Sequence, residues 1–380
     1  MDELTIGGLA ESLDAAREPE LAVIRDALDA NRFIGVTGPA EAGKTQLLRR
    51  AAASTELDGD LAVVWVDLDG VYSPRHLARR WLTAIARAAT GQVAFSHIRG
   101  LQRDVWPRST RRADNMLREI LGENYQAALG AVTSERSKGG DEEVARALAS
   151  TERLADLKRV LIVVDHLEAP ELSRALDVRN LLWQIRATTQ ASNSVSIAVA
   201  CRPGAVALAS DEDSAFFGDG RWVTVEVPRR DVWLAATGDW PPIADIWPLT
   251  EGHVWSTFLT VDRLRRDPQS HAVRAFAELA VENQPLAARS VQHAASLHRL
   301  GPQLLRGIAS KRGPYRAIPD APTRDVAAAA QRLELGGLTH RPQRGTWRVI
   351  NPFVAEVLRD RPTDLDAEQH ERSTIEAEAP

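Results

Sequence analysis

Eight residues near the amino terminus, from Gly38 to Thr45, have the spacing of a phosphate-binding loop. They read GPAEAGKT and match G-x-x-x-x-G-K-[ST] in full. Glycines allow such a loop to curl so that successive backbone N–H groups point at phosphate oxygens. We expect Lys44 to reach the β- and γ-phosphates of a nucleotide, and the Thr45 hydroxyl to bind magnesium. The residues predicted to contact the nucleotide here are Gly38, Pro39, Ala40, Glu41, Ala42, Gly43, Lys44, Thr45 and Gln46.

A magnesium-bound nucleotide also needs a carboxylate on a neighbouring strand, and residues 160–165 supply one. Their sequence, VLIVVD, is typical of a strand buried on both faces, and Asp165 ends it. Ligands of open α/β sheets bind at the carboxyl ends of the strands. The sequence therefore predicts that Asp165 and Thr45 bind Mg²⁺ together.

The residue that activates water is less clear from the sequence. His166 follows Asp165 directly, and the nearest glutamate is Glu168. Either the turn at 169–170 brings Glu168 back as a general base, or the water is poorly activated and the nucleotide stays bound for long periods. We favour slow hydrolysis. Arg202 leaves the apolar run at 195–201 and is expected to contact the γ-phosphate, an ordinary surface arginine being the alternative. The predicted catalytic residues are Lys44, Asp165, Glu168 and Arg202.

Strands and helices alternate through the first part of the chain. Helical periodicity over 18–30 places four apolar residues on one face, namely Leu21, Ile24, Ala27 and Leu28. Apolar runs predict strands at 32–37, 61–67, 160–165, 195–201 and 222–227. Strands separated by helices predict a parallel sheet with helices on both faces. The run at 61–67 lies between the loop and Asp165 in the chain, which is typical of the additional-strand class of P-loop ATPases.

The rest of the chain changes character twice. Residues 229–312 have a helical pattern without a strand signal, and 313–362 predict a winged helix: a helix stopped by two glycines, a hairpin, and a last helix that begins at Asn351-Pro352. The predicted division is an amino-terminal tail at 1–16, a P-loop ATPase domain at 17–228, an all-helical lid domain at 229–312, a winged-helix domain at 313–362, and an acidic disordered tail at 363–380.

Composition restricts the class of protein. The chain has 380 residues, 44% hydrophobic and 26% charged, with a net charge of -5, as expected of a soluble globular protein with two or three domains. The single cysteine, Cys201, excludes an internal disulfide and suits the reducing cytosol. The longest apolar run is far shorter than the ~20 residues that span a bilayer, and the first residues lack the basic region of a secretory signal. We expect a cytoplasmic protein without membrane contacts.

Together these features resemble the archaeal-type and STAND branch of the AAA-related ATPases, relatives of origin-recognition initiators and of NACHT and NB-ARC switch proteins. The phosphate loop, the strands ending at Asp165 and before Arg202, and the winged helix carry the likeness. Residues 17–21 (REPEL) resemble the family's G-R-x-x-E-L motif, with alanine in place of its glycine, which implies that Arg17 lies near the base and ribose. His166 departs from the family's pair of acidic residues.

A second motif of the family is incomplete. Gly252-His253-Val254 resembles the setting of its G-x-P motif near the nucleotide, with valine in place of proline. Gly252 and His253 are therefore candidate site residues, and an ordinary helix start is the alternative.

The resemblance implies a switch ATPase that holds ATP or ADP with Mg²⁺ between the sheet and the lid. Exchange or slow hydrolysis would move the winged helix and change self-assembly or the binding of a protein partner in trans. One alternative is a DNA-binding ATPase, initiator-like or transposition-accessory, that uses the winged helix and the basic stretches at 99–118 and 297–316. Seven arginines against five acids across 320–362 are weak support for it. A third alternative is a nucleotide-binding scaffold without turnover.

Overall fold

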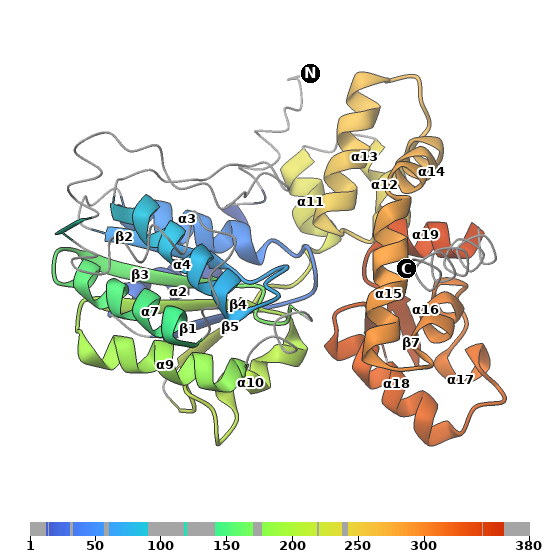
Figure 1. Ribbon diagram of the computed structural model, residues 1–380. Helices are drawn as coiled ribbons and strands as arrows, with labels where there is room; N and C mark the ends of the chain where they lie inside the picture. Colours follow the sequence, from blue (N-terminus) through green and yellow to red (C-terminus); the bar gives the residue numbers. More distant parts are fainter. Residues whose placement is uncertain are drawn as a thin grey trace, which may run out of the picture. The chain divides into compact units, whose positions relative to one another are not determined.

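The computed structural model describes residues 13, 15–30, 33–56, 61–89, 118–119, 141–169, 177–218, 220–237, 242–343 and 345–360. They form two compact units (Figure 1). The sheet unit comprises 18–38 and 44–225. The carboxyl-terminal unit comprises 226 onward together with the loop segment 39–43 and the described residues up to Arg17.

Several predictions lie outside the described residues. They concern the acidic tail at 363–380, most of the amino-terminal tail, the turn at Pro170, and all but the end of the basic stretch at 99–118. No helix within the described ranges has both the length and the apolar character of a membrane-crossing segment.

The sheet unit is built on five strands in the order β2-β3-β4-β1-β5. All neighbouring strands are parallel, which confirms the predicted parallel sheet. The strands are β1 (Phe33–Thr37), β2 (Leu61–Asp67), β3 (Arg159–Asp165), β4 (Val195–Cys201) and β5 (Gly220–Thr224). β5 therefore begins and ends earlier than the predicted run at 222–227.

The strand inserted between the loop strand and the aspartate strand is β4, and not the run at 61–67. β4 pairs with both β1 and β3, whereas β2 lies at the edge beside β3. The chain leaves β1 and crosses two sheet positions before it forms β2, so order along the chain differs from order in space. The likeness to the additional-strand class therefore rests on β4.

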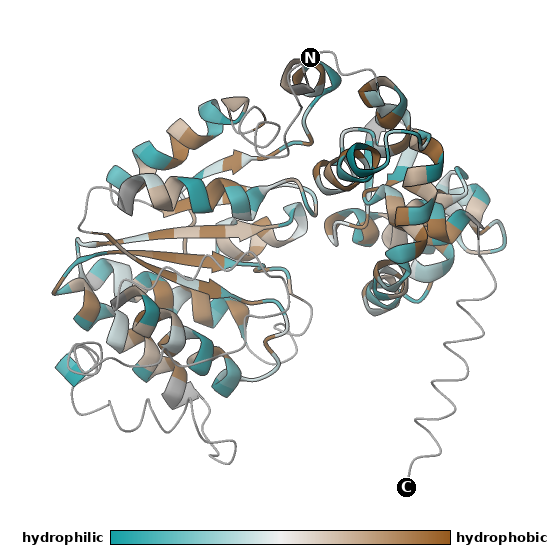
Figure 2. Ribbon diagram, turned by 90° about the horizontal axis from the view of Figure 1, so that it is seen from above, coloured by the Kyte–Doolittle hydropathy of each residue, from teal (hydrophilic) through white to brown (hydrophobic). Residues whose placement is uncertain are grey.

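Helices cover both faces of the sheet because its strands are apolar on both faces. All residues of β4 and all but the first of β3 are buried, and Figure 2 shows the brown strands between two helical layers. One layer holds α2 (Glu18–Asp29) and α3 (Lys44–Glu56), and the other holds α4 (Pro74–Ala89), α7 (Asp141–Ala155) and α9 (Val178–Ala191). The four apolar residues predicted to share a face of α2 are all buried. A short η2 (Pro203–Ala205) and α10 (Val206–Ser210) follow β4.

The carboxyl-terminal unit is helical apart from one hairpin. Its first helices are α11 (Arg230–Thr237), α12 (Pro242–Thr250), α13 (Val254–Arg266), α14 (Ala272–Glu282), α15 (Gln284–Leu297) and α16 (Gly301–Ala309). They are followed by α17 (Pro314–Ala317), α18 (Thr323–Leu335), the antiparallel strands β6 (Thr339–Gln343) and β7 (Thr346–Val349), and α19 (Pro352–Asp360). This order of helix, hairpin and helix is that of the predicted winged helix.

One apolar core joins the two parts of this unit that were predicted to be separate domains. It contains Phe276 of α14, Leu304 of α16, Leu333 of α18 and Phe353 of α19. The Phe353 ring is fully buried and its centroid lies 5.0 Å from that of Phe276. The boundary at 312/313 stays a prediction, and the helices on its two sides share this core.

Replacing Phe353 by alanine should destabilise the carboxyl-terminal unit by about 3–5 kcal/mol, because it removes a fully buried aromatic ring and leaves a cavity. Chemical denaturation measures the loss. Val273→Ala on α14, where the side chain is 64% exposed, is the control and should change stability by less than about 0.5 kcal/mol. Equal losses in the two variants would contradict a core centred on Phe353.

Candidate nucleotide-binding site

The phosphate loop connects β1 to α3, and the backbone requires its two motif glycines. A Cβ atom on Gly38 would lie 2.3 Å from the carbonyl oxygen of Val225, so a larger residue does not fit. Gly43 has a φ of +98°, a conformation that residues with a side chain rarely adopt. The loop therefore keeps the shape in which its N–H groups can surround a phosphate.

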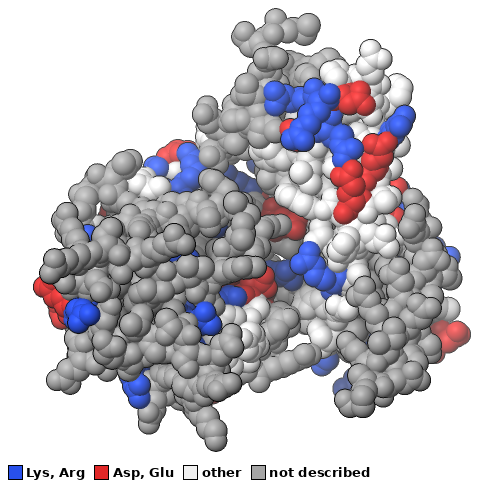
Figure 3. Space-filling model, turned by 45° about the horizontal axis from the view of Figure 1, so that its top comes forward, with Lys and Arg blue, Asp and Glu red and all other residues white. Residues whose placement is uncertain are grey.

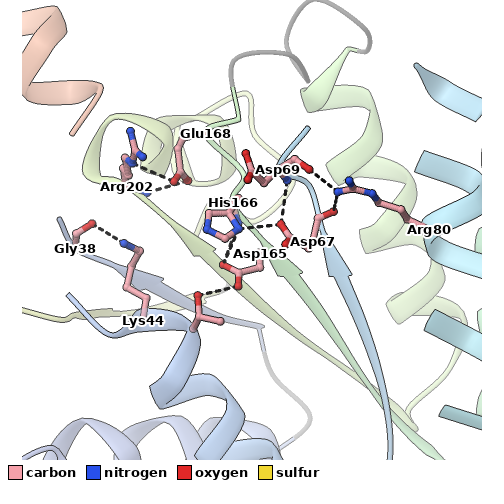
Figure 4. Close-up of polar contacts among 10 residues, drawn as sticks. Gly38, Lys44, Asp67, Asp69, Arg80, Asp165, His166, Glu168 and Arg202 are labelled. Atoms are coloured by element: carbon pink, nitrogen blue, oxygen red, sulfur yellow. Dashed lines mark hydrogen bonds and ion pairs between the residues drawn. The ribbon is translucent and has the colours of Figure 1, made fainter. Parts of the chain in front are cut away.

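Lys44 opens α3, and its side chain turns back along the loop. Its ammonium donates a hydrogen bond of 3.0 Å to the carbonyl oxygen of Gly38, and the residue is buried. Burial lowers the pKa of Lys44, while the Glu168 carboxylate acts in the opposite direction. A desolvated cation at the N-terminus of a helix is favourably placed to bind an anionic phosphate chain (Figure 4).

Thr45 and Asp165, the predicted magnesium ligands, are brought together by the fold. The Thr45 hydroxyl donates a 2.9 Å hydrogen bond to Oδ2 of Asp165. Asp165 is the last residue of β3 and is 2% exposed; burial raises its pKa. A buried carboxylate beside a hydroxyl is the hard-oxygen donor set that Mg²⁺ prefers, and the cation would offset the cost of burying the charge. These two residues therefore fit the predicted metal.

Asp67, which is absent from the predicted site, lies beside Asp165. The two aspartates are register partners at the ends of β2 and β3. Nδ1 of His166 lies 2.8 Å from Oδ1 of Asp67 and 3.7 Å from Oδ1 of Asp165. Burial acts to lower the pKa of His166, but the hydrogen bond to Asp67 and the nearby negative charges outweigh it and raise the pKa to about 9. The sequence did hold a signal, because an aspartate ends both apolar runs.

The turn after β2 is fixed by an arginine of α4. Arg80 donates from Nη1 to the carbonyl oxygens of Asp67 at 2.6 Å and Asp69 at 2.5 Å. The backbone N–H of Asp69 donates to Oδ1 of Asp67 at 2.9 Å. Asp67 is thus held in place on its backbone and on its carboxylate.

Glu168 and Arg202, both predicted to be catalytic, contact each other. Nε of Arg202 lies 3.2 Å from Oε1 of Glu168, and the backbone N–H of Arg202 donates to Oε2 at 3.1 Å. The glutamate side chain is 13% exposed and the arginine side chain 24% exposed. Both carboxylate oxygens of Glu168 are therefore engaged by the same residue.

Glu41, in the middle of the loop, contacts residues at the starts of α13 and α19 in the carboxyl-terminal unit, to which segment 39–43 belongs. Its Oε2 accepts a 3.1 Å hydrogen bond from Nδ2 of Asn351 and lies 3.4 Å from Nε2 of His253. The sequence marked Asn351 as the start of the last helix and gave no sign of this contact. His253 was a candidate for the site, and it does lie against the loop.

His253 is also the N-cap of α13, as the alternative of an ordinary helix start predicts. Its Nδ1 lies 2.8 Å from Oγ of Ser256. The carbonyl oxygen of the preceding Gly252 accepts a 3.2 Å hydrogen bond from Nε1 of Trp233. Burial, and then the nearby His340, lower the pKa of His253 to about 4. His253 is therefore neutral at pH 7, and its role toward a nucleotide stays a prediction.

Arg17, Gln46 and the loop residues Pro39 and Ala42 are further predicted nucleotide contacts. Arg17, expected near the base and ribose, donates to the backbone carbonyl oxygen of Glu226. Gln46 is exposed on the first turn of α3, and the N–H of Ala42 donates to the carbonyl oxygen of Pro39 at 3.4 Å. The roles of these residues toward a nucleotide stay predictions.

The Walker-type ATPase PABY2304 of Pyrococcus abyssi has a similar structure, with a TM-score of 0.61 and 18% identity over 90% of this chain and 95% of that chain. The chain has the fold of a Walker-type P-loop ATPase. This confirms the predicted fold class: the P-loop parallel sheet with helices on both faces is followed by a helical region and, where a winged helix was predicted, by a region with a small carboxyl-terminal sheet.

Other comparisons give weaker or no matches. The ORC1 protein of Aeropyrum pernix, in a structure with DNA, has a TM-score of 0.47 and 14% identity over 93% of this chain and 94% of that chain. A STAND protein with a tetratricopeptide repeat sensor from Pyrococcus horikoshii has a TM-score of 0.36 and 12% identity over 96% of this chain and 45% of that chain. No family model and no curated protein matches the chain.

The buried His253 should make the protein less stable in mild acid. The unfolded chain protonates this histidine near pH 6.5, whereas the folded chain keeps it neutral down to about pH 4, so stability present above pH 6.5 is lost as the pH falls toward 4. Between pH 7 and pH 5 the loss should be about 2 kcal/mol, measured by urea denaturation.

His253→Asn keeps an N-cap acceptor for α13 and removes the titrating group, so its stability should depend less on pH by that amount. His271→Asn at the exposed N-cap of α14 is the matched control and should keep the slope of the parent protein. His340 and Glu41 are the titratable groups that face His253. An unchanged slope in His253→Asn would exclude the buried histidine as the cause.

Proposed function

We propose that this protein is a nucleotide-dependent switch that binds Mg-ATP, hydrolyses it slowly, and responds to the difference between ATP and ADP with its lid and winged helix. The observation that carries the proposal is the contact of Glu41 with Asn351 and His253. A residue of the phosphate loop itself is held there by the elements that the switch would move.

Binding of the nucleotide is supported by the residues at the carboxyl edge of the sheet. The loop amides and Lys44 would hold the β- and γ-phosphates, and Thr45 with Asp165 would hold the metal. Bound Mg²⁺ would supply positive charge to the phosphate oxygens. Adenine is our choice from the family resemblance, and guanine nucleotides belong in the same test.

Slow hydrolysis is supported by the state of the two carboxylates nearest to Asp165. Asp67 is hydrogen-bonded to His166 at 2.8 Å, and Glu168 is held by Arg202. A general base must reach the attacking water directly or through one further water. Glu168 would have to leave Arg202 to do so, which favours a long-lived nucleotide complex.

The coupling is supported by the chemistry of the loop contact. Glu41 has a φ of +59°, a left-handed conformation that costs a residue with a side chain about 1 kcal/mol or more and needs support from its surroundings. Asn351 supplies that support from the start of α19, and His253 from the start of α13. If a terminal phosphate changes the conformation of the loop, Glu41 moves, and its contacts with the starts of α13 and α19 change first. A homo-oligomer or a protein partner in trans would then sense the rearranged surface.

The DNA-binding alternative receives less support from the described residues. Two arginines of the wing are paired with carboxylates: Arg341 with Glu334 at 2.7 Å, and Arg348 with Glu251. Figure 3 shows basic side chains lying next to acidic ones on the face that it draws. In the helical part of the same unit, Arg263 contacts two glutamates, Glu278 and Glu282. Such pairs reduce the positive charge available to a phosphate backbone.

Lys44→Ala should weaken the binding of ATP analogues by about 10- to 100-fold, because one charged hydrogen bond contributes about 1.5–3 kcal/mol. Isothermal titration calorimetry with Mg²⁺ and either an adenine or a guanine nucleotide measures this. Lys158→Ala, at the turn before β3 in the same unit, is the control and should bind like the parent. A folded parent protein that binds neither nucleotide would refute the proposal.

Asn351→Asp should uncouple the loop from α19. The aspartate can keep the cap that Asn351 Oδ1 provides to the N–H groups of Phe353 and Val354, but it places a carboxylate where Glu41 now accepts a hydrogen bond. The parent should show different hydrogen exchange of the α13 and α19 amides with ADP and with a slowly hydrolysed ATP analogue. The variant should lose most of that difference.

The double variant Glu41→Gln with Asn351→Asp exchanges donor and acceptor and should restore the difference. Glu41→Gln alone keeps an acceptor for Asn351 and serves as the second control. If the parent protein itself has the same hydrodynamic size and the same amide protection with both nucleotides, the switch hypothesis is wrong.

A further inference from the structure

The contact between Glu168 and Arg202 is favoured by the pairing of β3 with β4, because this pairing places the backbones of the two residues near each other. Arg202 directly follows β4, and Glu168 lies three residues after the end of β3. These strands are neighbours, and a hydrogen bond of 3.3 Å from the N–H of Leu167 to the carbonyl oxygen of Ala200 continues their pairing past the end of β3. The backbones of both partners are thereby fixed before any ligand binds.

The pair lies at the part of the site where phosphates are expected. Both residues act electrostatically on Lys44: Glu168 raises its pKa and Arg202 lowers it, after the larger effect of burial. Figure 4 shows both on the side of the strand ends that Lys44 and Gly38 also occupy. A phosphate bound to Lys44 would therefore lie in the field of both partners.

A terminal phosphate and the Glu168 carboxylate are both anions, and Arg202 can complement each of them. The carboxylate already takes the guanidinium Nε and the backbone N–H of this arginine. A phosphate that draws the guanidinium away must break a largely buried, charge-assisted contact, which has a free-energy cost. A nucleoside diphosphate lacks the terminal phosphate and leaves the contact intact. The cost therefore falls on the triphosphate complex alone.

We propose, on the basis of the function proposed above, that Glu168 is a specificity-determining residue: it competes with the terminal phosphate of the nucleotide for Arg202 and so lowers the affinity for the triphosphate relative to the diphosphate. The same exchange releases the carboxylate beside the terminal phosphate, where it can reach the attacking water. Glu168 would then have two positions. Bound to Arg202 it is inactive, and released from Arg202 it can act as the general base.

The test is a double-mutant cycle on binding, with calorimetry of ADP and of a slowly hydrolysed ATP analogue in the presence of Mg²⁺. Glu168→Gln removes the charge at constant shape and should raise the ratio of triphosphate to diphosphate affinity by about 10-fold, the size of one charged hydrogen bond. In the Arg202→Ala background, Glu168→Gln should leave the ratio of triphosphate to diphosphate affinity unaltered, because there is no guanidinium for which Glu168 and the phosphate could compete.

Glu212→Gln, an exposed glutamate of the same unit, is the matched control and should leave the ratio at the parent value. An equal gain in both backgrounds would mean that Glu168 repels the phosphate directly and would overturn the inference. So would an unchanged or lower ratio in Glu168→Gln with normal binding of both nucleotides, a result that leaves the proposed function intact. Failure of the parent protein to bind any nucleotide would instead refute the proposed function and this inference with it.

Discussion

The burial of charges at the carboxyl edge of the parallel sheet is the constraint on which the rest of the structure depends. Lys44 and Asp165 are both largely removed from water, and each would be costly there without partners of opposite charge or good hydrogen bonds. The Gly38 carbonyl oxygen and the Thr45 hydroxyl provide such bonds in the protein. The phosphates of a magnesium nucleotide would bring negative charge to Lys44, and the metal would bring positive charge to Asp165, so such a ligand is complementary in charge to these two residues.

Two further pairs surround this centre, and each joins neighbouring strands. His166 links the ends of β2 and β3 through Asp67, while Arg202 links β4 to the turn after β3 through Glu168. In each pair, the charged group of one residue occupies the position that water, a metal ion or a phosphate would otherwise take beside its partner. A ligand that binds one of these side chains would therefore have to compete with the partner that the side chain already has in the protein.

Segment 39–43 belongs to the carboxyl-terminal unit, although β1 before it and α3 after it belong to the sheet unit. Glu41 is the only charged residue of segment 39–43, and its carboxylate is held by Asn351 and lies beside His253. The core around Phe353 supports α19, and therefore also the position of Asn351. Packing in this unit and the conformation of segment 39–43 are thus connected through the Glu41 side chain.

Much of the fold could be predicted because each strand or helix is specified by the pattern of apolar and polar residues within its own segment. The apolar run that ends in Asp165 predicts a buried strand, and the spacing of Leu21 and Ile24 predicts the buried face of α2, since periodicity depends on neighbours in the chain. The order of strands is different: β4, and not the run at 61–67, lies between loop and aspartate strands. Strand order depends on where each connection between strands places the next strand in the sheet, and the residue pattern within one segment does not determine that.

The candidate site divides in the same way. The loop motif by itself determined that Gly38, Gly43, Lys44 and Thr45 form one structure, because their roles follow from backbone conformation and from a helix start within eight residues. Only the tertiary structure decided that Asp67 faces His166, that Arg202 holds Glu168 and that Asn351 holds Glu41. Each of these contacts joins residues whose meeting is set by sheet register or by packing over long stretches of chain, and side-chain type alone cannot specify which of many possible charged partners lies within 3 Å or so.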